Sequence, residues 1–344
     1  MMIYYIMIIS WLVYAALIHI RLSNPSALTV AALPFFSLLL LVGLRGSGVG
    51  TDTLGYISEF QDAGYRYRVT EFGFSSFIKF LHGVGLGTTQ FLFTVSLITT
   101  GSIAWVIHKY SKNITLSYLL YLNLGFMSFA MSGIRQAIAI SITSVALIFL
   151  IKNRKLVFSV LVLLATTFHN SAIIFILVLP FAGIRLTQLQ AIGIFVALLT
   201  IPFFAGDILL PVNNMLGFKY VSDYLSDASS SNPLLALIAI VIPLTSLFFW
   251  PKSNGLAMYS TFFLLSAVAM WFALAARDFQ MIGRMGLYFS VYSIVFLPNI
   301  VERISPMSIR WIARASLLFL AICFFAISTP GNSIGIDNYK FGVF

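Results

Sequence analysis

The sequence predicts an all-α integral membrane protein that crosses the bilayer many times. Of its 344 residues, 60% are hydrophobic and 9% are charged, and the mean hydropathy is +0.99. Soluble domains contain only about 45 to 50% apolar residues. Apolar runs long enough to cross the hydrocarbon core recur along the whole chain, so we expect about 11 to 12 membrane-crossing helices.

The predicted spans are apolar runs separated by short polar turns. The first run lacks the basic start and the small-residue cleavage site of a secretory signal, so we expect it to remain as a transmembrane helix. The segments 45–88 and 206–233 are expected to be outer loops, and residues 1–344 a single membrane domain. The ordinary spans are predicted at residues 2–20, 27–44, 89–108, 114–131, 134–151, 188–204, 234–250, 256–275, 282–300 and 315–328.

The apolar stretch 156–182 is too long for one ordinary span and too short for two. The basic clusters near residues 108–113, 152–155, 252 and 303–314 are expected in the cytoplasm by the positive-inside rule. With that sidedness, the stretch must enter the membrane and return to the same side. We therefore predict two helices of about 20 Å each that meet near His169. Their turn should lie in a protein-lined cavity, because irregular backbone is tolerated at membrane depth only there.

The composition disfavours several classes of function. The net charge of +10 comes from 10 acidic and 20 scattered basic residues, so no nucleic acid partner is expected. The single cysteine, Cys323, excludes a disulfide, a CxxC pair and a cysteine zinc site. No acidic residue lies between Glu71 and Asp207, so the intramembrane carboxylates typical of ion-coupled transporters are missing.

A glycine-rich loop follows the second predicted span. Three glycines lie between Arg45 and Asp52, and such a loop lets backbone N–H groups approach an anion or a sugar closely. The alternative is a turn held by an ion pair between Arg45 and Asp52. The loop is not a phosphate-binding P-loop, because the Lys-Ser/Thr pair and the preceding strand are missing.

Two polar residues begin the span at 134–151. A Ser-Gly pair precedes Arg135 and Gln136, which fall in the first turn of the predicted helix. Helix N-terminal N–H groups and a guanidinium together suit phosphate oxygens. Arg135 could instead only extend to the membrane interface, but Gln136 has no such reason to be there.

The predicted turn at 169 carries an imidazole. His169 could act as a general base or donate a hydrogen bond to substrate; the alternative is a turn histidine bonded to Asn170 or Ser171. A metal site is not expected, because the other histidines lie far away in this topology.

Two arginines seven residues apart, Arg277 and Arg284, would share a helix face and could both contact one diphosphate. Asp278 could instead neutralise one of them in a structural ion pair. Tyr56 belongs to a group of outer-loop aromatic residues that could stack on sugar rings.

Five motifs in order give the chain a family resemblance. It resembles the EpsG-like branch of the Wzy-type polysaccharide polymerases, and the similarity extends to the C-terminal segment 336–339. The motifs are Gly-Val-Gly-Thr-Asp-Thr at 48–53, Glu-Phe-Gly-Phe at 71–74, Gly-Ile-Arg-Gln-Ala-Ile-Ala at 133–139, Phe-His-Asn-Ser-Ala at 168–172 and Arg-Met-Gly-Leu-Tyr at 284–288.

The resemblance implies a bacterial inner-membrane glycosyltransferase with a GT-C-like fold. Such an enzyme joins lipid-linked oligosaccharide repeats on the periplasmic face, building O-antigen of lipopolysaccharide, capsule or exopolysaccharide. Donor and acceptor would both be undecaprenyl-diphosphate-linked glycans, and no cofactor or metal is expected. Membrane lipids and a chain-length regulator are the other expected partners.

We hypothesise direct displacement of undecaprenyl diphosphate by an acceptor hydroxyl, with inversion. Arg135 and Arg284 would stabilise the leaving diphosphate, and His169 would accept the hydroxyl proton, with Asp52 as the second choice of base. The residues expected to bind sugar or phosphate are Arg45, Gln136, Tyr56, Arg277, Asn170 and Tyr288.

Other activities remain open from the sequence. Ligation of finished polymer to lipid A core would need the same arginine and histidine chemistry. A flippase for lipid-linked sugars would need a large central cavity. A membrane O-acyltransferase could use His169 but would need a route for an acyl donor.

The predicted return of the chain at His169 fixes the side on which Thr187 lies. A topology reporter fused at Thr187 should give a cytoplasmic signal, because both ends of the stretch 156–182 lie on that side. A periplasmic signal at Thr187 would show that the stretch crosses the membrane once.

Overall fold

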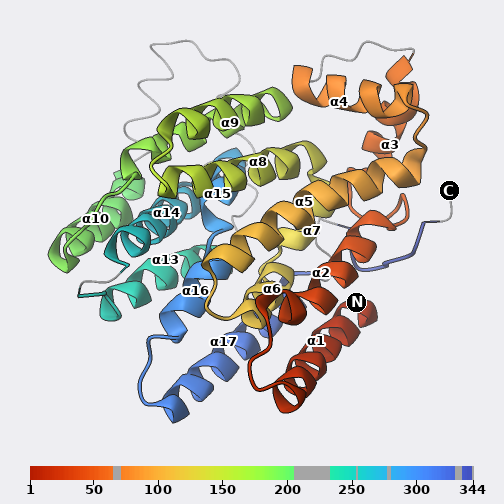
Figure 1. Ribbon diagram of the computed structural model, residues 1–344. Coiled ribbons are helices and arrows are strands. Elements are labelled where there is room, and N and C mark those ends of the chain that lie inside the picture. Colours follow the sequence, from red (N-terminus) through yellow and green to blue (C-terminus); the bar gives the residue numbers. More distant parts are fainter. Residues whose placement is uncertain (65–70, 205–232, 253–254, 277–279, 330–334, 343–344) are drawn as a thin grey trace, which may run out of the picture.

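The computed structural model describes residues 1–64, 71–204, 233–252, 255–276, 280–329 and 335–342. Within these residues the protein is a bundle of tilted helices (Figure 1), and the only extended pairing is an isolated antiparallel bridge between Arg45 and Phe341. The predicted all-α fold class is confirmed. The predicted outer loop 206–233 falls almost entirely outside the described residues.

The helices follow the predicted apolar runs. Those of the first half are α1 (Met2–Arg21), α2 (Ala27–Gly43), α3 (Thr53–Gln61), η1 (Asp62–Gly64), α4 (Phe72–Gly83), α5 (Thr88–Tyr110), α6 (Ile114–Asn123), α7 (Phe126–Ser132) and α8 (Ile134–Ile151). Those of the second half are α9 (Lys155–Phe168), η2 (Asn170–Phe181), α10 (Gln188–Thr200), η3 (Ile201–Phe204), α13 (Pro233–Phe248), α14 (Leu256–Ala275), α15 (Gln280–Ser290), α16 (Ser293–Val301) and α17 (Met307–Ser328).

The described helices are those of a multi-pass membrane protein. Five of them, α1, α5, α8, α14 and α17, are long and apolar enough to cross a membrane. The bent pairs α6–α7 and α15–α16 raise the number to as many as seven. The shorter apolar helices are α2, α9, η2, α10 and α13.

Three predicted spans differ from the structure. The run 114–131 is not one helix, because Gly125 adopts a left-handed conformation (φ 85°) that ends α6, and α7 then departs at 51°. The run 282–300 bends by 48° between α15 and α16. The last span begins at Met307 rather than at 315. The segment 45–88, predicted as a loop, contains the short helices α3 and α4.

The stretch 156–182 forms two short helices, as predicted. α9 ends at Phe168, and His169 has an extended backbone (φ −155°, ψ 117°) before η2 begins. The second helix is 3-10 rather than α. At about 2.0 Å per residue it spans about 24 Å, close to the roughly 21 Å of α9.

Glu302 organises one end of the bundle, which we call the Glu302 end. Its carboxylate accepts hydrogen bonds from Arg314 Nη2 at 2.6 Å, Arg314 Nε at 2.8 Å and Asn113 Nδ2 at 3.1 Å. Lys109, in the last turn of α5 shortly before Asn113, lies close to Lys152 in the turn between α8 and α9. The start of α9 therefore lies at the Glu302 end.

The chain returns to the Glu302 end after η2. Leu186, just before α10, accepts a hydrogen bond from Trp250 Nε1 at 3.3 Å. The Trp250 ring packs on Tyr259, and the Arg303 guanidinium lies 4.8 Å from the centre of the Tyr259 ring. The predicted basic clusters thus share one end, and α9 and η2 form a hairpin whose turn at His169 points to the opposite end.

The Glu302 interactions should contribute measurably to stability. Replacing Glu302 with alanine should lower the free energy of unfolding by about 2 kcal/mol, because it leaves the Arg314 guanidinium without its bidentate partner. Thermal unfolding of the purified protein measures the change. Arg310→Ala is the control, since the Arg310 guanidinium lies 3.8 Å from Glu302 and its loss should change stability by less than about 1 kcal/mol. Equal midpoints for wild type and Glu302→Ala would contradict this account.

Candidate functional site

Glu71 joins Arg135 and His169 at the end of the bundle opposite Glu302, which we call the Glu71 end. Arg135 Nη1 donates to Glu71 Oε2 at 2.6 Å, and His169 Nδ1 lies 3.1 Å from Glu71 Oε1. The Glu71 side chain is 11% exposed, whereas those of Arg135 and His169 are 30% and 29% exposed. The carboxylate is therefore covered, and the two basic groups remain within reach of a ligand.

Three elements bring these side chains together. Arg135 lies in the first turn of α8, His169 follows the last residue of α9, and Glu71 precedes α4. α4 approaches α9 at a glycine: a Cβ on Gly73 would lie 2.2 Å from Thr167 Oγ1 and 2.9 Å from the Thr167 carbonyl carbon. The absence of a side chain on Gly73 thus allows Glu71 to reach His169.

The surroundings of Glu71 favour its ionised form. Burial opposes ionisation, but a backbone N–H and the positive charges of Arg135 and His169 outweigh it, so the pKa of Glu71 lies below its ordinary value. The carboxylate is therefore negative at neutral pH.

Tyr56 contacts the Arg135 guanidinium from α3. Arg135 Nε lies 3.5 Å from the Tyr56 hydroxyl, and the guanidinium carbon lies 5.7 Å from the ring centre. Burial raises the pKa of Tyr56, so the phenol is neutral at physiological pH. Asp52, the second predicted base, is exposed just before α3 and is close enough to act electrostatically on Tyr56.

Arg284 is the exposed cation of this site. It lies on α15, close enough to His169 for their charges to interact. Its backbone oxygen accepts a hydrogen bond from Gln136 Nε2 at 2.7 Å. Within the described parts of the chain, no carboxylate lies within ion-pair distance of its guanidinium.

Several predicted substrate contacts are too deeply buried to touch a ligand in this conformation. Gln136 is 5% exposed and connects α8 to α15. Tyr288 is fully buried, and its hydroxyl lies 3.3 Å from Ser171 Oγ. Asn170, by contrast, is exposed at the start of η2. Arg277 lies outside the described residues.

Arg45, predicted to bind sugar or phosphate, is engaged by protein groups in this structure. Its side chain is fully buried and donates to the carbonyl oxygens of Val42 and Met131 and to Thr53 Oγ1. The predicted pair between Arg45 and Asp52 is replaced by these contacts. Arg45 thereby connects the end of α2 to the last turn of α7, which leads into α8 and Arg135.

The C-terminal segment covers the glycine-rich loop. Gly46 N donates to Lys340 O at 2.8 Å, and Gly50 N donates to Gly335 O at 2.9 Å. Gly50 has a positive φ of 87°, and a Cβ there would lie 2.7 Å from Met131 O. The loop glycines therefore permit close packing of backbone on backbone, and the predicted anion site at these N–H groups is occupied by protein.

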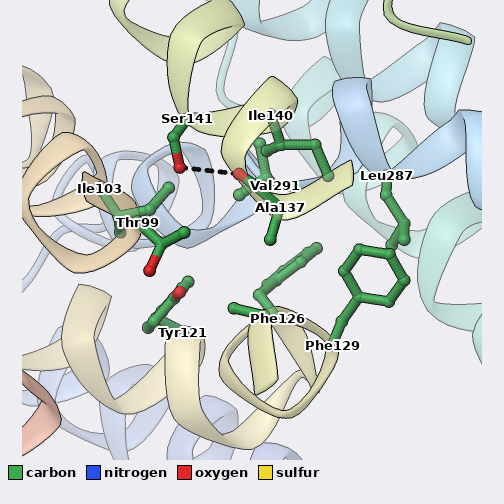
Figure 2. A pocket seen from close by; sticks show the side chains of 11 residues that line it. Thr99, Ile103, Tyr121, Phe126, Phe129, Ala137, Ile140, Ser141, Leu287 and Val291 are labelled. Atoms are coloured by element: carbon green, nitrogen blue, oxygen red, sulfur yellow. Dashed lines mark hydrogen bonds between the residues drawn. The ribbon is translucent and has the colours of Figure 1, made fainter. Parts of the chain in front are cut away.

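A small cavity lies deeper in the bundle, between α5, α6–α7, α8 and α15 (Figure 2). Its volume of about 20 Å³ has room for about one water molecule. The aromatic side chains of Phe126 and Phe129 lie on one side, and Ser141 donates to the Ala137 carbonyl on the other. None of its lining residues belongs to the predicted site, so it is not the cavity that we expected around His169.

A family model matches residues 28–341, and its description is the EpsG family. The chain belongs to the EpsG family. This confirms the resemblance inferred from the five motifs. The match extends from α2 through the C-terminal segment.

The chain is also similar to the amylovoran biosynthesis protein AmsC of Erwinia amylovora. The two are 27% identical over 161 residues, which are 44% of this chain and 43% of AmsC. The matched region thus spans less than half of that relative. No solved structure matches the chain, so the expected GT-C-like fold stays a prediction.

Glu71 is the residue that the sequence reasoning missed. Two features of the sequence could have indicated it. Glu71 begins the Glu-Phe-Gly-Phe motif, and no other acidic residue follows it until Asp207. No group of three or more metal-binding side chains occurs among the described residues; metal independence stays a prediction.

The close approach of α4 to α9 can be tested at Gly73. Gly73→Ala should lower the free energy of unfolding by about 1 to 3 kcal/mol through overpacking against Thr167. It should also reduce activity, because Glu71 moves away from His169. Thermal unfolding and the polysaccharide assay described below measure both effects.

The matched control is Gly83→Ala at the other end of α4. A Cβ on Gly83 would meet no atom within 4 Å, so this variant should be as stable as wild type or more so. Equal behaviour of the two variants would contradict the proposed contact.

Proposed function

We propose that this protein is a bacterial polysaccharide polymerase, a glycosyltransferase that joins undecaprenyl-diphosphate-linked oligosaccharide repeats. Membership of the EpsG family supports the activity class. The structural observation that supports it is the gathering of His169, Arg135 and Arg284 at the Glu71 end of a bundle of mostly apolar helices. Ionisable groups in such a setting mark a functional site.

The charges suit a phosphate leaving group. Arg284 is exposed and has no carboxylate partner among the described residues, so its guanidinium is available for two oxygens of a diphosphate. Arg135, 30% exposed in the first turn of α8, adds a second guanidinium at a helix N-terminus that no side chain caps. Fixed donors of this kind stabilise negative charge as it develops on a leaving group.

We assign to His169 the role of accepting the proton of the acceptor hydroxyl, because its side chain is 29% exposed beside Glu71. In the proposed reaction, a hydroxyl oxygen at the non-reducing end of one lipid-linked repeat forms a bond to the anomeric carbon of the growing chain. The bond from that carbon to the diphosphate oxygen breaks, and its electron pair leaves with undecaprenyl diphosphate. The hydroxyl proton passes to His169, and the anomeric centre inverts.

The charge distribution supports a periplasmic site in the inner membrane. The Glu302 end should face the cytoplasm by the positive-inside rule, which directs the Glu71 end to the periplasm. Basic residues in segments at the Glu302 end include Lys109, Lys112, Lys152, Arg154, Lys155, Arg185, Lys252, Arg303, Arg310 and Arg314.

The polymerase proposal is tested in a source strain that lacks the gene. Surface and lipid-linked polysaccharide from this strain should show a single capped repeat, and the wild-type gene should restore a ladder. His169→Ala and Arg284→Ala should each reduce the yield of polymer by roughly a hundredfold, because a proton acceptor or a charge-stabilising donor is lost. Arg21→Ala, at the end of α1, is the control and should restore the ladder.

Other polysaccharide patterns in the deletion strain would indicate other activities. Loss of capped material while long lipid-linked chains persist would indicate a ligase. Unpolymerised repeats retained on the cytoplasmic face would indicate a flippase. An unchanged ladder in the deletion strain would contradict the proposal.

A further inference from the structure

The Glu71 carboxylate uses both of its oxygens on two groups of the proposed site. Oε2 accepts from Arg135 at 2.6 Å and Oε1 lies 3.1 Å from His169 Nδ1. With 11% exposure, the carboxylate has little room for a substrate of its own. We propose that Glu71 is a positioning residue that fixes the tautomer of His169 and compensates the charge of Arg135, an inference that rests on the proposed function.

The geometry determines which imidazole nitrogen can accept a proton. An ionised carboxylate only accepts hydrogen bonds, so a neutral His169 carries its hydrogen on Nδ1 and donates it to Glu71 Oε1. The lone pair then lies on Nε2, which makes no hydrogen bond within the described protein. Nε2 is therefore the atom that receives the acceptor proton, and Glu71 stabilises the imidazolium that forms.

The Glu71 carboxylate gives Arg135 and Arg284 different roles in binding the diphosphate. Arg135 is compensated by Glu71 and held by Tyr56, whereas Arg284 has no carboxylate partner among the described residues. Arg284 therefore supplies most of the attraction for the diphosphate, and Arg135 mainly directs its N–H groups.

The groups around His169 predict the effect of removing the carboxylate. Glu71 acts on the imidazole from the start of α4, Arg135 from α8 and Arg284 from α15. The Tyr288 phenol, also on α15, lies within electrostatic range of Glu71. Glu71 is the one anion among them and favours the imidazolium, whereas the two arginines disfavour it. Without Glu71, His169 should lose its proton at lower pH, and the acidic limb of the activity profile should move to lower pH.

The experiment uses purified full-length protein in liposomes with lipid-linked repeats extracted from the deletion strain. Glu71→Gln keeps the size of the side chain but removes its charge, and its amide can donate to Nδ1 and place the hydrogen on Nε2. We expect kcat to fall by roughly a hundredfold or more, KM to change little, and the acidic limb to shift to lower pH. Glu71→Asp, which keeps the charge, should retain part of the activity.

Asp62→Asn is the matched control, because Asp62 is an exposed carboxylate in the same outer segment. It should leave kcat, KM and the pH profile unchanged. Thermal unfolding of every variant separates a positioning effect from a loss of structure.

Nitrogen NMR of histidine-labelled protein gives a readout that does not require turnover. The chain has four histidines, and comparison with His169→Gln identifies the signals of His169. In wild type, the neutral ring should carry its hydrogen on Nδ1; in Glu71→Gln, the hydrogen should move at least partly to Nε2.

The outcomes separate this inference from the proposed function. Wild-type kcat, pH profile and tautomer in Glu71→Gln would overturn the role of Glu71 while polymerisation by wild type still stood. Absence of polymer with wild-type protein would overturn the proposed function, and the nitrogen spectrum would still decide the tautomer. If Glu71→Gln does not fold, a hydrogen on Nε2 of wild-type His169 would overturn the inference, and a hydrogen on Nδ1 would support it.

Discussion

The ionised carboxylate of Glu71 connects three elements that are distant in the sequence. It reaches the first turn of α8 through Arg135 and the turn of the α9–η2 hairpin through His169. In an apolar bundle, an uncompensated charge is strongly disfavoured, so each basic group favours a place beside this carboxylate. The contact in turn requires α4 to approach α9 at Gly73. The relative positions of α4, the start of α8 and the α9–η2 turn therefore depend on this carboxylate.

At each end of the bundle a carboxylate binds an arginine, but the consequences differ. At the Glu302 end, one carboxylate holds Arg314 through two hydrogen bonds, which joins helices. At the Glu71 end, the carboxylate also holds an arginine, but within the described residues it leaves one nitrogen of His169 without a hydrogen bond and the Arg284 guanidinium without a carboxylate partner. A purely structural cluster would satisfy these donors and acceptors. Their availability is the feature that supports chemistry at this end.

The polar residues singled out from the sequence form two groups, one accessible and proposed to take part in the reaction, the other buried and holding helices in place. His169, Arg135 and Arg284 are reachable from solvent, whereas Arg45 and Gln136 are buried and bind other parts of the protein. The buried, supporting residues determine where the accessible residues lie. Arg45 holds the last turn of α7, just before α8, through Met131 O, and Gln136 holds α15 through the backbone of Arg284. A substitution in either group would therefore affect activity, but only the supporting group should also affect stability.

The sequence alone determined the membrane class, most of the helices and the return of the chain at His169. These follow from composition, from the length of apolar runs and from the parity of the basic turns, all of which are local or additive properties. The sequence also brought Arg135 and His169 into one proposed site. It could not distinguish the buried Arg45 from the exposed Arg284, because both are arginines beside glycines near the end of a span.

Only the tertiary structure decided the partners of these charges. Burial and hydrogen bonding depend on which helices pack together, and Glu71 lies 64 residues from Arg135 and 98 from His169 along the chain. No local pattern predicts such contacts. The bends after α6 and α15 were missed for the same reason: hydropathy follows the apolar character of a run, whereas its straightness depends on backbone conformation and on packing against neighbours.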